Sequence, residues 1–229
     1  MKLPATTWLG DLLGRIGIVV VFTHAAAVKT KLLFGLIKAQ QLAGADFLRL
    51  LSETANLAFL ILIVATTIVR LRPLRAAGGI EPRVTALSGA FALAFMVLLP
   101  ATIHLPPAMT VFALCLLLTG FSLSAYVLYW LGRSFSVMAE ARRLVTVGPY
   151  ASVRHPLYAT EEIAILGILL LNLSLPAMAL VSLQWAIQLR RMHHEEQVLR
   201  AAFPEYERYA AVTPKVLPRL WAAPLRKPI

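Results

Sequence analysis

Long apolar segments alternate with short polar connections along most of the chain. A helix that crosses the bilayer core needs about 20 apolar residues, and five segments approach or reach this length, at roughly 51–69, 84–102, 107–130, 157–172 and 175–190. A weaker sixth segment at about 8–28 is interrupted by Asp11 and Arg15. Only the sequence NLSLP separates the last two segments, and Pro176 there favours a helix start. We therefore expect an all-α integral membrane protein, a bundle of five or six transmembrane helices that ends in a tight helical hairpin.

Composition supports this assignment. Charged residues make up 14% of the chain and hydrophobic residues 59%, whereas soluble domains carry about 25% charged residues. The net charge is +11, but the basic residues do not form a stripe with interleaved aromatic residues, as a nucleic-acid surface would. They lie at the ends of the apolar segments, where anionic lipid headgroups favour them. We therefore expect the lipid bilayer as a partner and no nucleic acid.

The basic residues also indicate an orientation. Several arginines follow the segments at 51–69 and 107–130, and arginines and lysines follow 175–190, whereas TIHLPP and NLSLP contain none. Positive charge marks the cytoplasmic side, so the loop at 131–156 and the C-terminal tail are predicted to share that side. Four residues do not fit this topology: Lys29, Lys31, Lys38 and Arg49. The sequence leaves open whether 8–28 crosses the membrane or lies along an interface.

The first polar cluster is the loop LGRSFSVMAEARRLVTVGPYASVRHPLY at 131–158. Gly148-Pro149 predicts a turn, and Pro156 restricts His155 to an extended or turn conformation. These restrictions would hold the side chains of Arg154 and His155 in a defined direction. The same residues are also compatible with a stiff, positively charged loop without further function.

The second cluster is RRMHHEEQVLRAAFPEYERY at 190–209. On a helix Arg191 and Glu195 share a face, as do His193 and Glu196. The aromatic residues that follow predict the apolar face of an amphipathic helix on the membrane surface. Because the predicted topology brings both clusters to one edge of the bundle, they offer cations, a constrained histidine, paired carboxylates and aromatic rings beside lipid.

The order of these motifs resembles the isoprenylcysteine carboxyl methyltransferase and phospholipid methyltransferase superfamily. Its pattern is Arg-His-Pro-x-Tyr-x-Gly, then Glu-Glu, then Phe-Gly-x-x-Tyr-x-x-Tyr, and this chain has RHPLYAT, HHEEQ and FPEYERY over about 131–220. Thr160 and Pro204 stand where the family has glycine. The resemblance implies a core at 106–229, which consists of transmembrane helices, the Arg-His-Pro loop, the hairpin and a C-terminal amphipathic helix. Residues 1–105 would then form a transmembrane scaffold.

The resemblance further implies S-adenosylmethionine as cofactor and a lipophilic methyl acceptor. Cofactor-binding roles would fall to one set of residues: Tyr150, Arg154, His155, Pro156, Tyr158, Glu195 and Glu196. Catalytic roles would fall to Arg191, His155 and Glu162, although Glu161 and Glu162 can equally be acidic residues in the first turn of a helix, where the dipole favours them. No metal is expected, because the neighbouring residues His193, His194, Glu195 and Glu196 point in different directions on a helix. The cofactor pocket and active site would lie on the cytoplasmic face, in the inner membrane of a bacterium or archaeon.

Four functions remain open at this stage. The resemblance favours carboxyl O-methylation of the acceptor, as in isoprenylcysteine carboxyl methyltransferase, and N-methylation of a phospholipid amine is the alternative within the family. A carboxylate would need no general base, whereas an amine would. Membrane reductases that use NADPH have a related arrangement, but theirs is Arg-His-x-Asn-Tyr with a later Arg-Asp pair. A non-enzymatic scaffold or transporter would carry ionisable residues within its spans, and the segments at 84–102 and 107–130 have none.

Overall fold

Helices dominate the computed structural model, which describes residues 5–38, 44–99, 101–103 and 105–218. The α-helices are α1 (Ala5–Lys38), α2 (Ala45–Val69), α3 (Glu81–Phe91), α4 (Pro107–Leu131), α5 (Pro156–Leu171), α6 (Leu175–Ala202) and α7 (Tyr206–Val212). Short 3-10 helices are η1 (Ala92–Leu98), η2 (Gly132–Ser134) and η3 (Gly148–Ala151). The strands β1 (Arg75–Ala76) and β2 (Glu140–Ala141) pair antiparallel.

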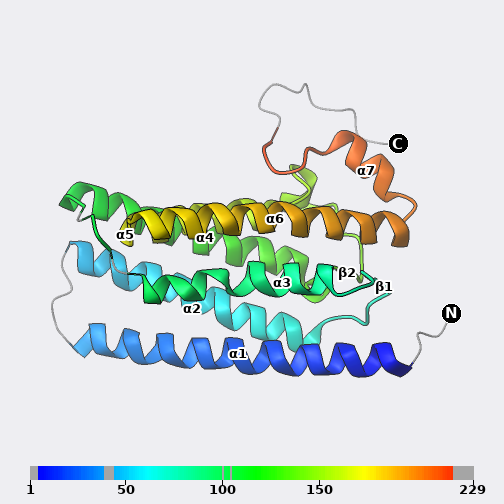
Figure 1. The fold of residues 1–229 in the computed structure, drawn as a ribbon, viewed down its shortest axis with the longest axis horizontal. Helices are drawn as coiled ribbons and strands as arrows, with labels where there is room; N and C mark the ends of the chain where they lie inside the picture. Colours follow the sequence, from blue (N-terminus) through cyan, green and yellow to red (C-terminus); the bar gives the residue numbers. More distant parts are fainter. Residues whose placement is uncertain (1–4, 39–43, 100, 104, 219–229) are drawn as a thin grey trace.

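The long helices run side by side, with α2, α4 and α6 in one direction and α1 and α5 in the other (Figure 1). Helices α1, α2, α4 and α5 form a row in which each packs on the next. Helix α6 packs mainly on α3 and η1, and these elements cover one face of the row. The two layers leave space between them, and the site described below lies there.

Helices α4 and α5 approach each other closely because two glycines lie at their contact. A Cβ atom on Gly120 of α4 would lie 2.4 Å from the Ala164 backbone nitrogen, and one on Gly167 of α5 would lie 2.7 Å from the Ala113 carbonyl oxygen. Small residues allow this approach in membranes, where packing rather than water drives helix association. This contact fixes the position of α5, which begins at the proline of the Arg-His-Pro motif.

Three helices are long and apolar enough to cross a membrane among the described residues, at Gly14–Lys38, Ala45–Val69 and Pro107–Ser134. The weak segment at 8–28 is therefore part of a longer helix that meets the requirements of a span. The segment at 84–102 is not one regular helix, because α3 gives way to η1 at Ala92. The expected class, an all-α membrane protein, is confirmed.

The predicted hairpin is present as α5 and α6. Helix α5 ends at Leu171, and the Ser174 side chain then caps α6 by accepting a hydrogen bond from the Ala177 backbone nitrogen at 3.3 Å. Proline at the start of α6 suits this position, because the first N–H groups of a helix have no partner within it.

Two local expectations were wrong. Residues 190–209 do not form one amphipathic helix, because α6 ends at Ala202 and Pro204 separates it from α7. The ring of Tyr206 is then turned inward and is buried. Glu161 and Glu162 lie outside the first turn of α5, since the helix begins at Pro156.

Lys29, which did not fit the predicted topology, lies within α1 and forms an ion pair with Glu53 of α2. The Lys29 Nζ to Glu53 Oε2 distance is 2.5 Å. This lysine is therefore not a loop residue, and it does not count in the orientation rule.

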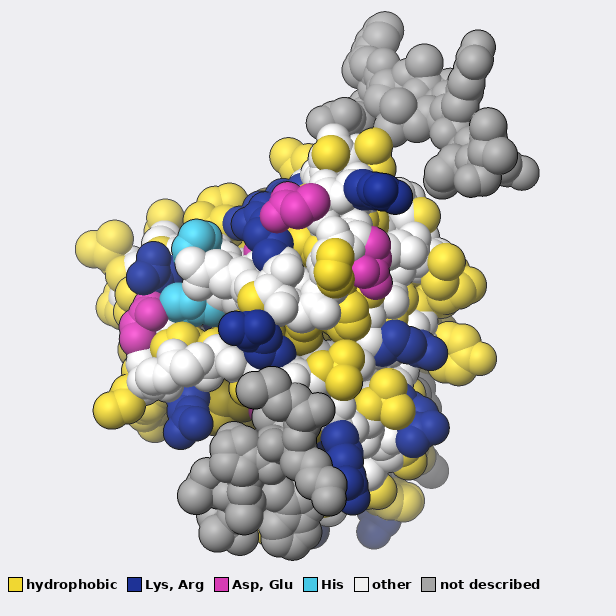
Figure 2. Space-filling model, turned by 90° about the vertical axis from the view of Figure 1, so that its right-hand side faces the viewer, with side chains coloured by type: hydrophobic (Ala, Val, Ile, Leu, Met, Phe, Trp, Pro, Cys, Tyr) yellow, Lys and Arg dark blue, Asp and Glu magenta, His cyan; other side chains and the backbone are white. Residues whose placement is uncertain are grey.

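Polar side chains gather at the end of the bundle that carries β1, β2 and α7. Figure 2 shows this end, with arginine, lysine, glutamate and histidine side chains together and hydrophobic side chains around the rim. Hydrogen bonds tie the connections here: the Leu71 nitrogen donates to the Arg133 carbonyl oxygen (2.9 Å), and the Arg133 Nε donates to the Val69 carbonyl oxygen (2.9 Å).

Candidate active site

The Arg-His-Pro motif is held in place by its backbone. Gly148 has φ +61, and a Cβ atom there would lie 2.5 Å from the Trp130 ring, so the turn requires glycine. The Arg154 and His155 nitrogens donate to the carbonyl oxygens of Pro214 and Lys215, at 2.9 and 3.0 Å. The chain after α7 thus returns to the loop and fixes it before Pro156 starts α5.

Arg154, His155 and Glu196 form a buried cluster. Arg154 Nε and His155 Nε2 each lie 3.0 Å from Glu196 Oε1. The Arg154 NH1 atom donates to the carbonyl oxygens of Ala210 (2.7 Å) and Thr213 (3.0 Å). The cluster therefore connects the loop, α6 and the segment after α6, and all three nitrogens of the Arg154 guanidinium take part in it.

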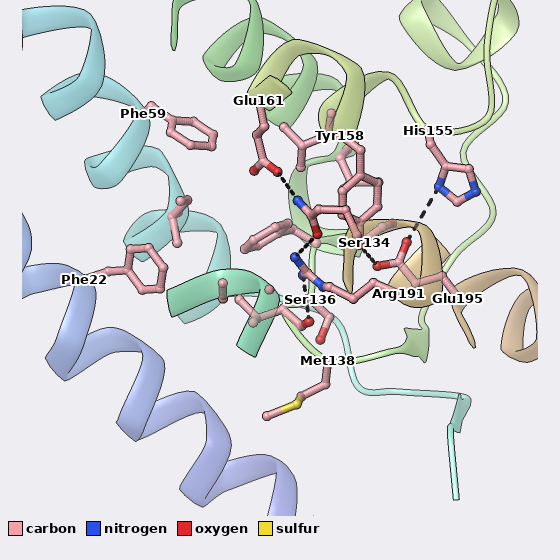
Figure 3. A pocket seen from close by; sticks show the side chains of 18 of the residues that line it. Phe22, Phe59, Ser134, Ser136, Met138, His155, Tyr158, Glu161, Arg191 and Glu195 are labelled. Atoms are coloured by element: carbon pink, nitrogen blue, oxygen red, sulfur yellow. Dashed lines mark hydrogen bonds and ion pairs between the residues drawn. The ribbon is translucent and has the colours of Figure 1, made fainter. Parts of the chain in front are cut away.

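The neighbouring carboxylate, Glu195, lies in a different environment. It accepts a hydrogen bond from the Tyr158 hydroxyl, and its Oε2 atom lies 3.9 Å from His155 Nδ1. The guanidinium carbon of Arg191 lies 5.1 Å from the centre of the Tyr158 ring, in a cation–π contact. His155 therefore stands between the two carboxylates, and Figure 3 shows Glu195, Tyr158 and Arg191 together on one side of it.

A chain of hydrogen bonds continues from Arg191 to Glu161. Arg191 NH1 donates to Gln188 Oε1 at 2.7 Å, and Gln188 Nε2 donates to Glu161 Oε2 at 3.3 Å. Arg191 NH2 donates to the Val137 carbonyl oxygen at 3.2 Å. Arg191 is thus oriented by neutral groups, and Glu161 faces the same space from α5 (Figure 3).

These side chains line a cavity of about 870 Å³ between the two layers of helices. Its other walls are mainly apolar and include Phe22 and Phe59, which Figure 3 shows on the far side from His155. Four buried polar atoms of lining residues have no hydrogen-bond partner among the described residues: Ser134 Oγ, Gln184 Oε1, Arg191 Nε and Tyr206 OH. Since buried polar groups are normally satisfied, a cavity with such walls suits a ligand that is polar at one end.

The surroundings of Glu196 and Tyr209, which lie outside the membrane-spanning helices, shift their pKa values in opposite directions. Burial raises the pKa of Glu196, but the hydrogen bond from His155 and the charges of His155, Arg154 and Lys215 outweigh it and bring the pKa to about 2. Burial raises the pKa of Tyr209 to about 12, despite the opposing charge of Arg154. At neutral pH Glu196 is therefore an anion, and Tyr209 is a neutral donor whose hydroxyl bonds the Tyr150 carbonyl oxygen at 2.6 Å.

Most of the predicted site residues meet at this cavity. Its lining includes Tyr150, Arg154, His155, Tyr158, Arg191 and Glu195. Pro156, Glu162 and Glu196 are not among the described lining residues. Pro156 begins α5, Glu196 holds Arg154 and His155, and Glu162 interacts with Gln184 of α6.

Sequence reasoning placed Arg191 and Glu195 in the site but missed Gln184 and Gln188, which precede them on α6. Gln184, Gln188, Arg191 and Glu195 all line the cavity, and their spacing of 4, 3 and 4 residues places them along one face of the helix. The signal was present as two glutamines in an apolar segment. The cavity lining includes Glu161, which accepts a hydrogen bond from Gln188, and not the predicted Glu162. Glu161 is therefore the carboxylate of this pair that faces the ligand space.

Part of the chain matches a known protein family. Residues 108–206 match the family model described as phospholipid methyltransferase. This segment is similar to the phospholipid methyltransferase family. The match extends from the start of α4 to the start of α7, so it contains the Arg-His-Pro motif and the Glu-Glu pair, and it confirms the resemblance predicted from them. It supports a membrane methyltransferase in general.

Two relatives carry names from metal resistance. The cobalt-zinc-cadmium resistance protein CzcN of Cupriavidus metallidurans is 41% identical over 78 residues, which is 34% of this chain and 36% of the relative. The nickel-cobalt-cadmium resistance protein NccN of Alcaligenes xylosoxydans xylosoxydans is 35% identical over 82 residues, 35% of this chain and 38% of the relative. The chain thus spans little more than a third of the length of these relatives. Within the described residues no group of three or more His, Cys, Asp or Glu side chains could hold a metal ion.

Proposed function

We propose that this protein is an S-adenosylmethionine-dependent methyltransferase that methylates a carboxylate on a lipophilic acceptor. One observation carries the choice of acceptor: Arg191 is a cation on the wall of a mainly apolar cavity, and its Nε–H has no hydrogen-bond partner among the described residues. A carboxylate beside it would satisfy this donor and balance its charge.

The residues at the polar end fit the cofactor by their chemistry. His155 offers a ring nitrogen for the cofactor's carboxylate, and Glu195 offers acceptors for its amino group or ribose hydroxyls. Tyr150, Tyr158 and Tyr206 supply aromatic surface, which attracts a sulfonium by cation–π interaction. Arg154 and Glu196 are occupied by each other, and Arg154 also donates to the carbonyl oxygens of Ala210 in α7 and of Thr213. We therefore give them a positioning role: they hold His155 and the C-terminal segment in place.

When bound, the cofactor would supply a methyl group on a positively charged sulfur: the acceptor oxygen would bond to the methyl carbon in line, and the sulfur would leave with the bonding pair as the neutral thioether of S-adenosylhomocysteine. The protein's contribution is then orientation and electrostatics. Arg191 would hold one carboxylate oxygen and so direct the other toward the methyl group. Tyr158 and Gln188 keep Arg191 in that position, through the ring contact at 5.1 Å and the hydrogen bond at 2.7 Å. No general base is needed, because a carboxylate is ionised at neutral pH.

An amine acceptor is the second candidate, and Glu161 is the observation that favours it. This carboxylate lines the cavity and accepts one hydrogen bond from Gln188, at 3.3 Å. It could hold an ammonium group and take its proton before methyl transfer. In this case Glu161, rather than Arg191, would determine the acceptor.

We further propose that the polar end faces the cytoplasm in the inner membrane of a bacterium or archaeon. The proposal rests on the arginines and lysines at the end of the bundle seen in Figure 2 and on the rule that such residues stay inside. The acceptor would then reach the apolar part of the cavity from the bilayer.

Calorimetric titration of the purified protein in lipid nanodiscs, with S-adenosylhomocysteine and separately with NADPH, tests the cofactor. Binding of the first alone supports the proposal, whereas binding of NADPH alone would assign the protein to the reductases.

Transfer of labelled methyl groups to fatty acids and to long-chain amines then tests the acceptor. Arg191→Gln should abolish methylation of carboxylates, while the matched control Arg190→Gln should retain it, because Arg190 is exposed and pairs with Glu81 at 2.8 Å. Transfer to amines only would favour the second candidate.

A further inference from the structure

A polar group of unexplained function lies at the other end of the cavity. Lys29 of α1 and Asn56 of α2 line both the large cavity and an adjoining cavity of about 280 Å³. Ser52, Glu53 and Asn172 line the smaller one. All but Asn172, which directly follows α5, come from helices outside the segment that matches the methyltransferase family.

The ion pair between Lys29 and Glu53 is costly at this location. Both residues lie within helices that are apolar and long enough to cross a membrane, where ionisable side chains are rare and usually mark a functional site. A buried ion pair adds little net stability compared with apolar side chains of the same volume. A merely structural contact between α1 and α2 therefore does not require these charges.

The pair is also accessible from the cavity. The Lys29 side chain is 28% exposed and that of Glu53 18%, and Glu53 engages one of the three donors of the ammonium group. Asn56 adds a donor and an acceptor on the same wall. Because lysine and glutamate cancel each other's charge, the group suits a ligand that forms hydrogen bonds but carries no charge.

Helix α5 gives the distance between the two polar ends. Glu161 lines the large cavity, Ile168 lines both cavities and Asn172 lines the smaller one. At about 1.5 Å per residue, 7 to 11 residues correspond to roughly 10–16 Å. An extended chain advances about 1.2 Å per bond, so roughly 9 to 13 bonds span this distance.

We propose that Lys29, Glu53 and Asn56 form a second binding site for the acceptor, which holds a neutral hydrogen-bonding group such as a hydroxyl at the distal end of its chain. This inference rests on the proposed function, because it assumes that the methylated group lies near Arg191 and Glu161. It assigns the acceptor to chains with polar groups at both ends, separated by about 9 to 13 bonds.

Two pairs of probes test the site without methyl transfer: dodecanoic acid against 12-hydroxydodecanoic acid, and dodecylamine against 12-amino-1-dodecanol. Binding to the protein in nanodiscs is measured by calorimetry. We expect the hydroxylated member of at least one pair to bind about three- to tenfold more tightly, the effect of one hydrogen bond. No preference in either pair for the wild-type protein would overturn the proposal.

Two variants locate the preference. Lys29→Met with Glu53→Met removes both charges together, and Asn56→Leu leaves the ion pair in place. The double variant should lose the preference, and Asn56→Leu should weaken it. A preference retained by the double variant would show that the hydroxyl binds elsewhere. S-adenosylhomocysteine binding is measured on the same samples. A variant that still binds S-adenosylhomocysteine is folded. If the wild type does not bind it, the proposed function is contradicted, and the hydroxyl preference alone then decides whether the second site exists.

Discussion

Glu195 and Glu196 are adjacent in the sequence, yet their carboxylates lie in different environments on either side of His155. Glu195 bonds the Tyr158 hydroxyl and lines the cavity, whereas Glu196 pairs with Arg154 at 3.0 Å and is not among the described lining residues. Neighbouring side chains on a helix diverge by about 100°, so one carboxylate reaches the ligand space and the other reaches the loop.

This difference predicts opposite effects of two matched variants. Glu196→Gln should destabilise the protein by about 2 kcal/mol, because the largely buried Arg154 and the buried His155 lose their ionic partner. Glu195→Gln should leave the stability nearly unchanged but weaken S-adenosylhomocysteine binding about tenfold, since a hydrogen bond to a charged group is lost. Thermal unfolding and calorimetry on both variants provide the test. A stable Glu196→Gln protein that no longer binds the cofactor product would reverse the two assignments.

The same ion pair predicts how stability depends on pH. The pKa of Glu196 is about 2 in the folded protein, below the ordinary value of 4.5, so the folded state favours the ionised form. This contribution is fully present above about pH 4.5 and is lost as the pH falls toward 2. The difference in unfolding temperature between wild type and Glu196→Gln should therefore be constant from pH 7 to 5 and shrink below that. A difference that does not change down to pH 3 would show that the pair does not control acid stability.

The contact between α4 and α5 predicts a sensitive glycine. Gly120→Ala should lower the stability by about 2 kcal/mol, because the added methyl group would overlap the backbone of Ala164. Gly35→Ala in α1 is the matched control, since nothing lies within 4 Å of a Cβ atom there. It should leave the stability unchanged or slightly higher. Unfolding temperatures in detergent compare the two variants, and equal values would argue against the close approach.

Thr160, which replaces the family's glycine, predicts an effect on packing alone. Its Oγ1 atom lies 3.0 Å from Ser124 Oγ of α4 and 2.9 Å from the Leu157 carbonyl oxygen, and the described lining of the cavity does not include it. Thr160→Gly should therefore lower the stability by about 1–2 kcal/mol and leave S-adenosylhomocysteine affinity within twofold. Ser124→Ala removes the same interhelical bond and serves as control. A large change in affinity for Thr160→Gly only would mean that this position reaches the site after all.

Hydropathy and charge predicted the helical hairpin and the meeting of His155 with the Glu-Glu pair, because both depend on local patterns. The choice between Glu161 and Glu162 depended on where α5 begins and how it is rotated, and this rotation is set by glycine contacts with α4 that no local pattern reveals. The return of Pro214 and Lys215 to the loop could not be predicted either, since it joins segments about 60 residues apart through backbone atoms. The helix break at Phe203 was signalled by Pro204, but the aromatic pattern on both sides of it concealed the break.

Helix α6 runs without interruption for 28 residues, about 42 Å, from the apolar hairpin turn past Glu195 and Glu196 to Ala202. We expect a change of tilt at the apolar half of this continuous helix to be transmitted to its polar half. Hydrophobic mismatch with a thinner or thicker bilayer changes the tilt of membrane helices. We therefore expect the distance between Glu195 on α6 and Tyr158 on α5 to vary with bilayer thickness, so that S-adenosylhomocysteine affinity should differ between nanodiscs of short-chain and long-chain lipids.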